Sequence, residues 1–151
     1  MTPEAEQLFT DGQFKFMDEE YDEAIENFTK VIELEPGFVK AYQARAIAYL
    51  RKGDSAKAIE DITKAIEIDP ENHRLHYHKG AIHLKNDELD EAVEALSRAI
   101  DLAPDYAPAY FLRSEVYDKL GEEEAAAADF NKADSLRKEQ THASKIVDFW
   151  R

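Results

Sequence analysis

Four histidines lie close together in the middle of the chain, and histidine is the residue type in this region that most readily binds a metal or gains a proton. They are His73, His76, His78 and His83. Histidines one or two helical turns apart can bind zinc. However, His76 and His83 stand at positions that tyrosines occupy elsewhere in the chain, so we interpret these two as replacements of core aromatic residues. If they are buried and neutral, this part of the chain should lose stability as the pH falls.

The remaining residues show no catalytic pattern. The five glycines are isolated, so there is no glycine-rich phosphate loop, and the serines and histidines form no recognisable nucleophile motif. Paired acidic residues are numerous, but this is the expected background of a solvated helix face. We therefore predict that the protein is not an enzyme and that it has no metal and no cofactor.

Composition narrows the class of protein further. The chain has 151 residues, room for one domain, and 44% hydrophobic residues argue against global disorder. Cysteine is absent, which excludes disulfides and mildly favours a reducing compartment. No signal peptide and no membrane-spanning run are visible. A net charge of −14 disfavours nucleic acid and anionic membrane as partners. The expected location is the cytoplasm.

A period of 34 residues organises the chain. Alanine recurs at this spacing, and proline does so three times: Ala24, Ala58, Ala92 and Ala126; Pro36, Pro70 and Pro104. A fixed period of this size indicates a repeat array. The units span residues 5–38, 39–72, 73–106 and 107–140, with a tail at 141–151.

The apolar spacing within each unit is that of helices. With caps and stops taken from Thr2, Gly53, Asp54 and the prolines, the expected helices are 3–17, 21–34, 38–52, 55–68, 72–85, 89–102, 106–121 and one that starts among 122–124. Lys138 replaces the proline that ends the earlier units, so the last helix can run on past Leu136. We interpret the tail as a final helix that caps the end of the array.

Three further columns at the same period predict how the helices pack. Small residues should let two helices approach closely: Gly12, Ala46, Gly80 and Ser114. Large residues should fill the gap between units: Phe28, Ile62, Leu96 and Phe130. Arg45 and Arg113 should form ion pairs with Asp61 and Asp129, exposed pairs of little energetic value.

These columns resemble the tetratricopeptide repeat. Its pattern of a large residue, a small residue, an aromatic, alanine, a large residue, alanine and proline is matched in the second unit by Tyr42, Ala46, Tyr49, Ala58, Ile62, Ala65 and Pro70. The first unit departs from the pattern at Lys15, where an aromatic is expected. The resemblance implies an all-α fold, a right-handed superhelix (an α-solenoid) of four helical hairpins plus a C-terminal capping helix. It also implies a groove, lined by the first helices, that binds a peptide or helix of another protein.

The first helices should therefore carry the binding residues. The segments that contain the second helices carry a net charge of −18, more than the −14 of the whole chain, whereas the middle first helices are basic. The predicted groove residues, opposite the core face, mix aromatic and basic types: Lys40, Gln43, Ile47, Arg51, Arg74, Tyr77, His78, Lys85, Phe111 and Lys119. Such a groove suits an acidic or apolar segment of a partner. Its aromatics can equally well serve only to pack neighbouring first helices together.

Two alternatives bear on the partner. Some tetratricopeptide domains hold acidic chaperone C-termini in a clamp of lysines, asparagines and an arginine. The corresponding positions here are Phe9, Gln13, Ala44, Arg74 and His78, which argues against that role because only Arg74 matches in charge. The second alternative is a homo-oligomer in which the tail, with Phe149 and Trp150, enters a neighbouring molecule.

Overall fold

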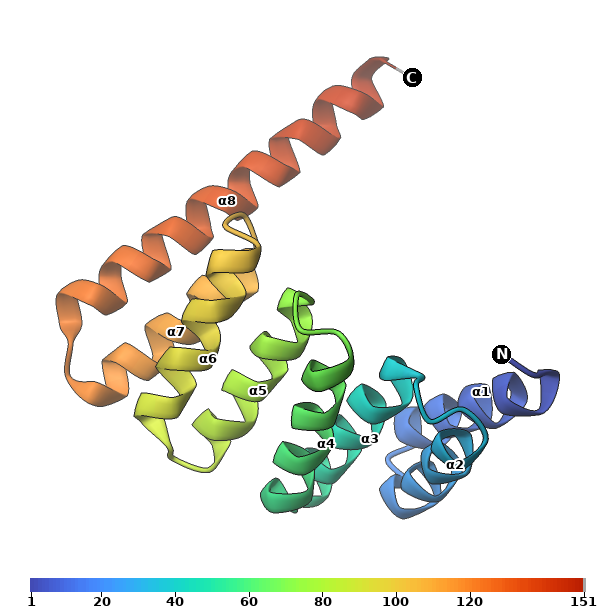
Figure 1. The fold of residues 1–151 in the computed structure, drawn as a ribbon. Coiled ribbons are helices and arrows are strands. Elements are labelled where there is room, and N and C mark those ends of the chain that lie inside the picture. Colours follow the sequence, from blue (N-terminus) through green and yellow to red (C-terminus); the bar gives the residue numbers. More distant parts are fainter. Residues whose placement is uncertain (151) are drawn as a thin grey trace.

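The computed structural model describes residues 1–150, with side chains as far as Lys145. The described part consists of helices joined by short turns: α1 Pro3–Met17, α2 Tyr21–Leu34, α3 Val39–Lys52, α4 Ser55–Ile68, α5 His73–Lys85, α6 Leu89–Leu102, α7 Ala107–Leu120 and α8 Glu123–Trp150. Consecutive helices pair into four hairpins that follow one another along an arc (Figure 1). The predicted all-α solenoid is confirmed, and the helix ends lie within a residue or two of those expected.

Local chemistry explains where several helices begin and end. The Thr2 hydroxyl accepts a hydrogen bond from the Ala5 amide at 3.2 Å, and the Asp54 carboxylate accepts one from the Lys57 amide at 3.2 Å. Both satisfy amides that the first turn of a helix leaves without a partner. Gly53 ends α3 with a φ of 98°, a left-handed conformation that favours glycine. The predicted caps are therefore present.

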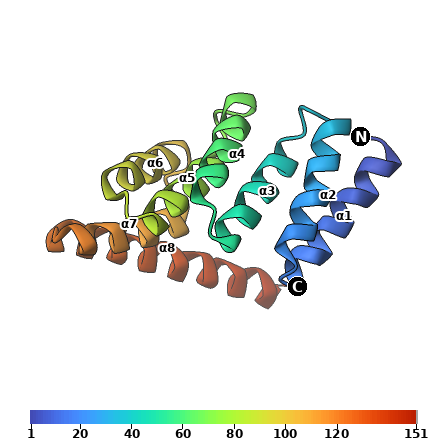
Figure 2. The ribbon, with the colours of Figure 1, turned by 90° about the horizontal axis from the view of Figure 1, so that it is seen from below.

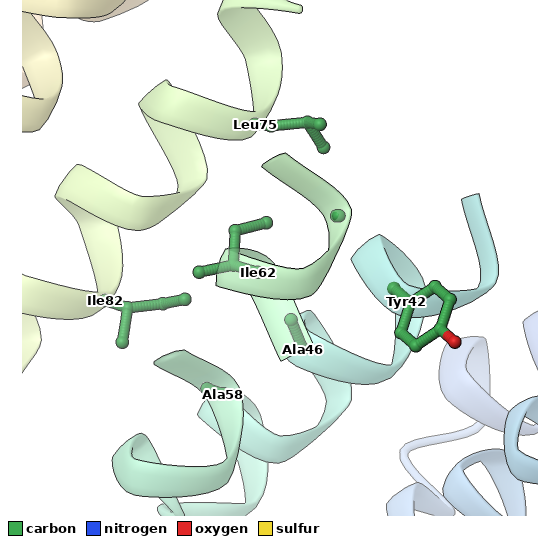
Figure 3. Packing of buried hydrophobic residues seen from close by; sticks show 7 residues of the cluster. Tyr42, Ala46, Ala58, Ile62, Leu75 and Ile82 are labelled. Atoms are coloured by element: carbon green, nitrogen blue, oxygen red, sulfur yellow. The ribbon is translucent and has the colours of Figure 1, made fainter. Parts of the chain in front are cut away.

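Each junction between hairpins is built around one apolar side chain of a second helix. Ile62 of α4 packs against Leu75 and Ile82 of α5, and all three are almost fully buried (Figure 3). Leu96 packs with Val116 in the same way at the next junction. Within each hairpin, a small residue admits the large one. A Cβ on Gly80 would lie 2.6 Å from Cγ of Leu96, and one on Gly12 would lie 2.6 Å from Cε1 of Phe28.

The column of large residues differs from expectation at its last member. Phe28, Ile62 and Leu96 are buried, but the side chain of Phe130 is 49% exposed. The prediction that Phe130 fills a gap between units is wrong because no fifth hairpin follows within the described residues.

The predicted ion pairs form, but they are not exposed pairs. Nε and Nη2 of Arg45 each donate to Asp61 at 2.7 Å, and Nη1 donates to the hydroxyl of Thr29 in the preceding hairpin at 3.1 Å. Arg113 makes the equivalent bonds to Asp129 and Ser97. Asp61 and Asp129 are buried, so each arginine ties two hairpins together in an environment where loss of its partner is costly.

The tail is part of α8. Residues 141–150 continue the helix that begins at Glu123, so the tail is an extension of this helix and not a separate one. α8 is much longer than the other helices and runs on beyond α7 (Figure 2). The idea that Phe149 and Trp150 enter a neighbouring molecule concerns side chains outside the described ones. In the part of the chain that is described, no helix has the length and apolar character needed to span a membrane.

Candidate partner-binding groove

The first helix of each hairpin faces the inner side of the arc. α1 contacts α3, α3 contacts α5, and α5 contacts α7, whereas no two second helices contact each other in the described residues. The first helices are therefore closer together than the second helices, so the array is concave on their side. The groove is the name we give to the side chains of the first helices on that side.

The N-terminal half of the groove contains a hollow of about 770 Å³ between α1, α3 and the start of α5. It brings together four of the predicted residues: Lys40, Gln43, Ile47 and Arg74. Lys40 and Arg74 are exposed. The Asp69 carboxylate in its lining accepts a hydrogen bond from the Asn72 amide at 3.2 Å. The hollow thus offers two cations and several amide groups, which suits a carboxylate-bearing segment.

A second hollow, of about 410 Å³ and mostly apolar, lies at the C-terminal end of the groove, where residues of α8 line it together with residues of α5 and α7. Tyr77 and Phe111 were predicted and line it, together with Pro108, Leu112 and Phe130. The ring centroids of Phe111 and Phe130 are 5.8 Å apart, and both side chains are nearly half exposed. Phe130 was missed as a site residue. The signal that could have identified it is its place as the last member of a core column with no following repeat.

Aromatic contacts connect the two hollows. The Tyr77 ring packs edge-on against His78 at 5.4 Å and against Tyr106 at 5.6 Å between centroids. The Arg74 guanidinium lies 5.8 Å from the centre of the Tyr106 ring. This cation–π contact orients Arg74 at the edge of the basic hollow. Burial raises the pKa of the Tyr77 hydroxyl, so Tyr77 stays neutral in the groove.

The remaining predicted residues lie outside the two hollows. The Arg51 guanidinium lies 5.6 Å from the centre of the Phe16 ring, and Lys85 Nζ donates to the Leu50 carbonyl of the preceding hairpin at 3.2 Å. Lys119 is exposed in the last turn of α7. We infer that Arg51 and Lys85 mainly hold adjacent first helices together.

The histidines do not converge on a common point. A ring nitrogen of His76 lies 2.9 Å from the Pro70 carbonyl, the contact that the Tyr42 and Tyr110 hydroxyls make with Pro36 and Pro104. His76 thus replaces a tyrosine in role as well as in position. His83 contacts Glu88 at 3.3 Å, and His78 faces Tyr77. Among the described residues, no three potential metal-ligating side chains gather to hold an ion.

We expect stability to depend on pH through His78. Burial, and secondarily the positive charge of Arg74, lowers the pKa of His78 below its ordinary 6.5. The unfolded chain then binds a proton more readily than the folded one, so stability falls as the pH drops below about 6.5. Urea unfolding at pH 7.5 and 5.5 measures this loss. His78→Gln should reduce it, whereas His142→Gln, at an exposed position of α8, should not. Equal pH dependence in all three proteins would contradict the assignment.

Known proteins share both the repeat and the arrangement. Family models of the tetratricopeptide repeat match residues 27–60, 44–107 and 77–140. No curated protein matches the chain. A crystal structure of MamA superposes on this chain with a TM-score of 0.76 and a sequence identity of 31%. The match covers 84% of this chain and 74% of the MamA chain. MamA from Desulfovibrio magneticus RS-1, at 22% identity, 90% and 77% coverage and a TM-score of 0.82, has the same fold.

A further solved structure contains a bound peptide. The first tetratricopeptide domain of Spaghetti (RPAP3), bound to the HSP90 peptide SRMEEVD, is 26% identical. It covers 80% of this chain and 96% of its own, with a TM-score of 0.75. Repeats of this kind are generally non-catalytic protein-interaction modules. The family matches together cover residues 27–140, and the chain belongs to the tetratricopeptide repeat family.

Proposed function

We propose that this protein is a non-catalytic binding module that holds an extended or helical segment of another protein in its groove. The observation that supports this most directly is the difference in chemistry between the two hollows. The hollow near Lys40 and Arg74 suits acidic groups, and the hollow between Phe111 and Phe130 suits an apolar side chain. A segment with an acidic part and an apolar anchor would satisfy both.

The neighbour with a bound peptide supports this assignment and also limits it. That domain binds a peptide with consecutive acidic residues. In this chain Phe9, Gln13, Ala44 and Arg74 occupy the expected clamp positions, and all four line the basic hollow. With one cation and one aromatic among them, the hollow provides less charge and more apolar surface than a clamp of lysines and asparagines. We therefore expect a mixed apolar and acidic ligand rather than a chaperone C-terminus.

The groove model predicts a loss of binding when both hollows are altered. Peptides selected from a displayed random library on the wild-type protein serve as probes, with affinity measured by fluorescence anisotropy. Arg74→Ala combined with Tyr77→Ala should raise Kd more than tenfold, because it removes the cation of one hollow and the aromatic wall of the other. Circular dichroism should show an unchanged helical content.

Lys64→Ala is the matched control for charge, because Lys64 is an exposed cation of a second helix, away from the groove. It should leave Kd unchanged. Peptides that bind the double variant as tightly as the wild type would rule out the groove as the binding surface.

A further inference from the structure

The junction between successive hairpins has the same plan throughout the array. One large side chain of a second helix is covered by two side chains, seven residues apart, on the next first helix. At the central junction these are Ile62, with Leu75 and Ile82 (Figure 3). Every member of these covering pairs is almost completely buried: Ala41 and Ala48, Leu75 and Ile82, Ala109 and Val116. Each junction is therefore an interface with two halves. The first half is the large side chain of the second helix, and the second half is the covering pair on the next first helix.

The C-terminal end of the array presents the first half without a cover. Phe130 stands in the column of Phe28 and Ile62, and its ring leans on Phe111 much as Phe28 leans on Phe9 (centroids 5.8 and 5.6 Å apart). Phe28 is 1% exposed beneath α3, whereas Phe130 is 49% exposed. The same aromatic pair is thus closed at one end of the array and open at the other.

The N-terminal end presents the second half with one change: the covering positions hold Gln7 and Phe14, so that only Phe14 is apolar. Phe14 of α1 stands at the position of Ala48, Ile82 and Val116, and it is 60% exposed. The side chains at this position face the preceding hairpin, and none precedes α1 in the described structure. Phe14 lines neither hollow of the groove. Exposure of a large aromatic side chain to water is unfavourable, and an interface at this face would bury it.

We propose that two copies of this chain associate head to tail, with α1 of one copy packed against α7 and α8 of the other in the place of a fifth hairpin. In this register Phe14 of one copy covers Phe130 of the other. Polar groups match as well. Within the array, Arg45 and Arg113 donate to the hydroxyls of Thr29 and Ser97 in the preceding hairpin. At the contact between copies, Asp11 occupies the arginine position and Asn131 occupies the hydroxyl position. The Asn131 amide can donate to the Asp11 carboxylate, so the roles of donor and acceptor are exchanged.

Acidic groups weaken this contact and make it reversible. Inside the array Lys52 pairs with Asp22 across a junction at 2.5 Å, but between copies the same positions hold Asp18 and Glu124. Asp134 occupies the column of Ile32 and Ile66, where it pairs with Arg137 and Lys138 on its own helix. Repulsion between carboxylates falls as salt screens it. Association should therefore strengthen with ionic strength, whereas a contact based on opposite charges would weaken.

The geometry also predicts the form of the assembly. The two surfaces differ, so the contact is heterologous, and each copy keeps one free end of each kind. Such a contact repeats into open chains whose length grows with concentration. Because Phe130 also lines the apolar hollow, α1 of the next copy closes that hollow, and only the last copy of a chain keeps it open for a peptide.

Complementary variants test the proposal. Phe14→Asp destroys the N-terminal half of the contact and leaves the C-terminal half, and Phe130→Asp does the reverse. By sedimentation velocity over a range of protein concentrations, the wild type should form species that grow in mass. Each variant alone should stay monomeric, and an equal mixture of the two should form a dimer of twice the monomer mass and nothing larger. Ile68→Asp, at an exposed apolar residue of α4 in the middle of the array, is the control and should associate like the wild type.

Several results would overturn the proposal: a wild type that is monomeric at every concentration, variants that still associate, or a mixture that remains monomeric. Association through the C-terminal residues 146–151 would survive both substitutions and would therefore count against it. Both side chains are exposed, so the variants should keep their helical circular dichroism. Phe14→Asp should also keep its peptide affinity, which separates this test from that of the groove.

Discussion

Replacing Ile62 with alanine is expected to lower the free energy of unfolding by about 2–5 kcal/mol. Ile62 is fully buried between the two hairpins and contacts Leu75 and Ile82 of α5. Removal of its side chain leaves a cavity at the junction, where rigid helices cannot close it. Among the described residues, the first two hairpins contact the last two only at this junction, so the two halves should also unfold less cooperatively.

Phe130→Ala is the matched control, because it removes a larger side chain from the same column at the open end of the array. Its cost should be clearly smaller, since about half of that side chain is already in water. Urea unfolding followed by circular dichroism measures both, at a protein concentration low enough to keep the chain monomeric. A larger loss for Phe130→Ala than for Ile62→Ala would contradict the description of the core.

Asp61→Ala should be the second most damaging change, at about 2–3 kcal/mol. It removes both carboxylate oxygens that accept from Arg45 and leaves the guanidinium with the Thr29 hydroxyl as its one hydrogen-bond acceptor in the described structure. Loss of one partner of a fully buried ion pair costs roughly 3–5 kcal/mol. The side chain of Arg45 is 18% exposed, so contact with water reduces the expected loss of stability.

The double variant Arg45→Leu with Asp61→Ala should recover most of this loss, because no unpaired charge then remains. Lys15→Ala is the control for an exposed ion pair, since Lys15 contacts Glu20 and Glu23 at the surface, and we expect little change. If the double variant is no more stable than Asp61→Ala, the unpaired guanidinium is not the cause of the loss. The cycle of single and double variants measures the coupling directly.

The repeat, the helices and their register were predictable from the sequence alone. These follow from local rules: the 34-residue period, the spacing of Ala58, Ile62 and Ala65, the left-handed glycine at Gly53 and the caps at Thr2 and Asp54. The ion pair of Arg45 with Asp61 was predictable for the same reason, because the hairpin places the two side chains opposite each other wherever the register is kept. The groove residues could be assigned to the first helices, since the face opposite a core stripe is known once the stripe is known.

The environment of the positions at the two ends of the repeat array follows only from the packing of the helices. Phe130 and Phe14 belong to columns that are buried elsewhere, and only the absence of a neighbouring hairpin in the described structure exposes them. The burial of Asp61 and the division of the groove into a basic and an apolar hollow likewise depend on how close neighbouring hairpins come. Whether a side chain is buried depends on the neighbouring hairpin. The repeat pattern gives the residue type at each position, but it does not show which other residues cover that position.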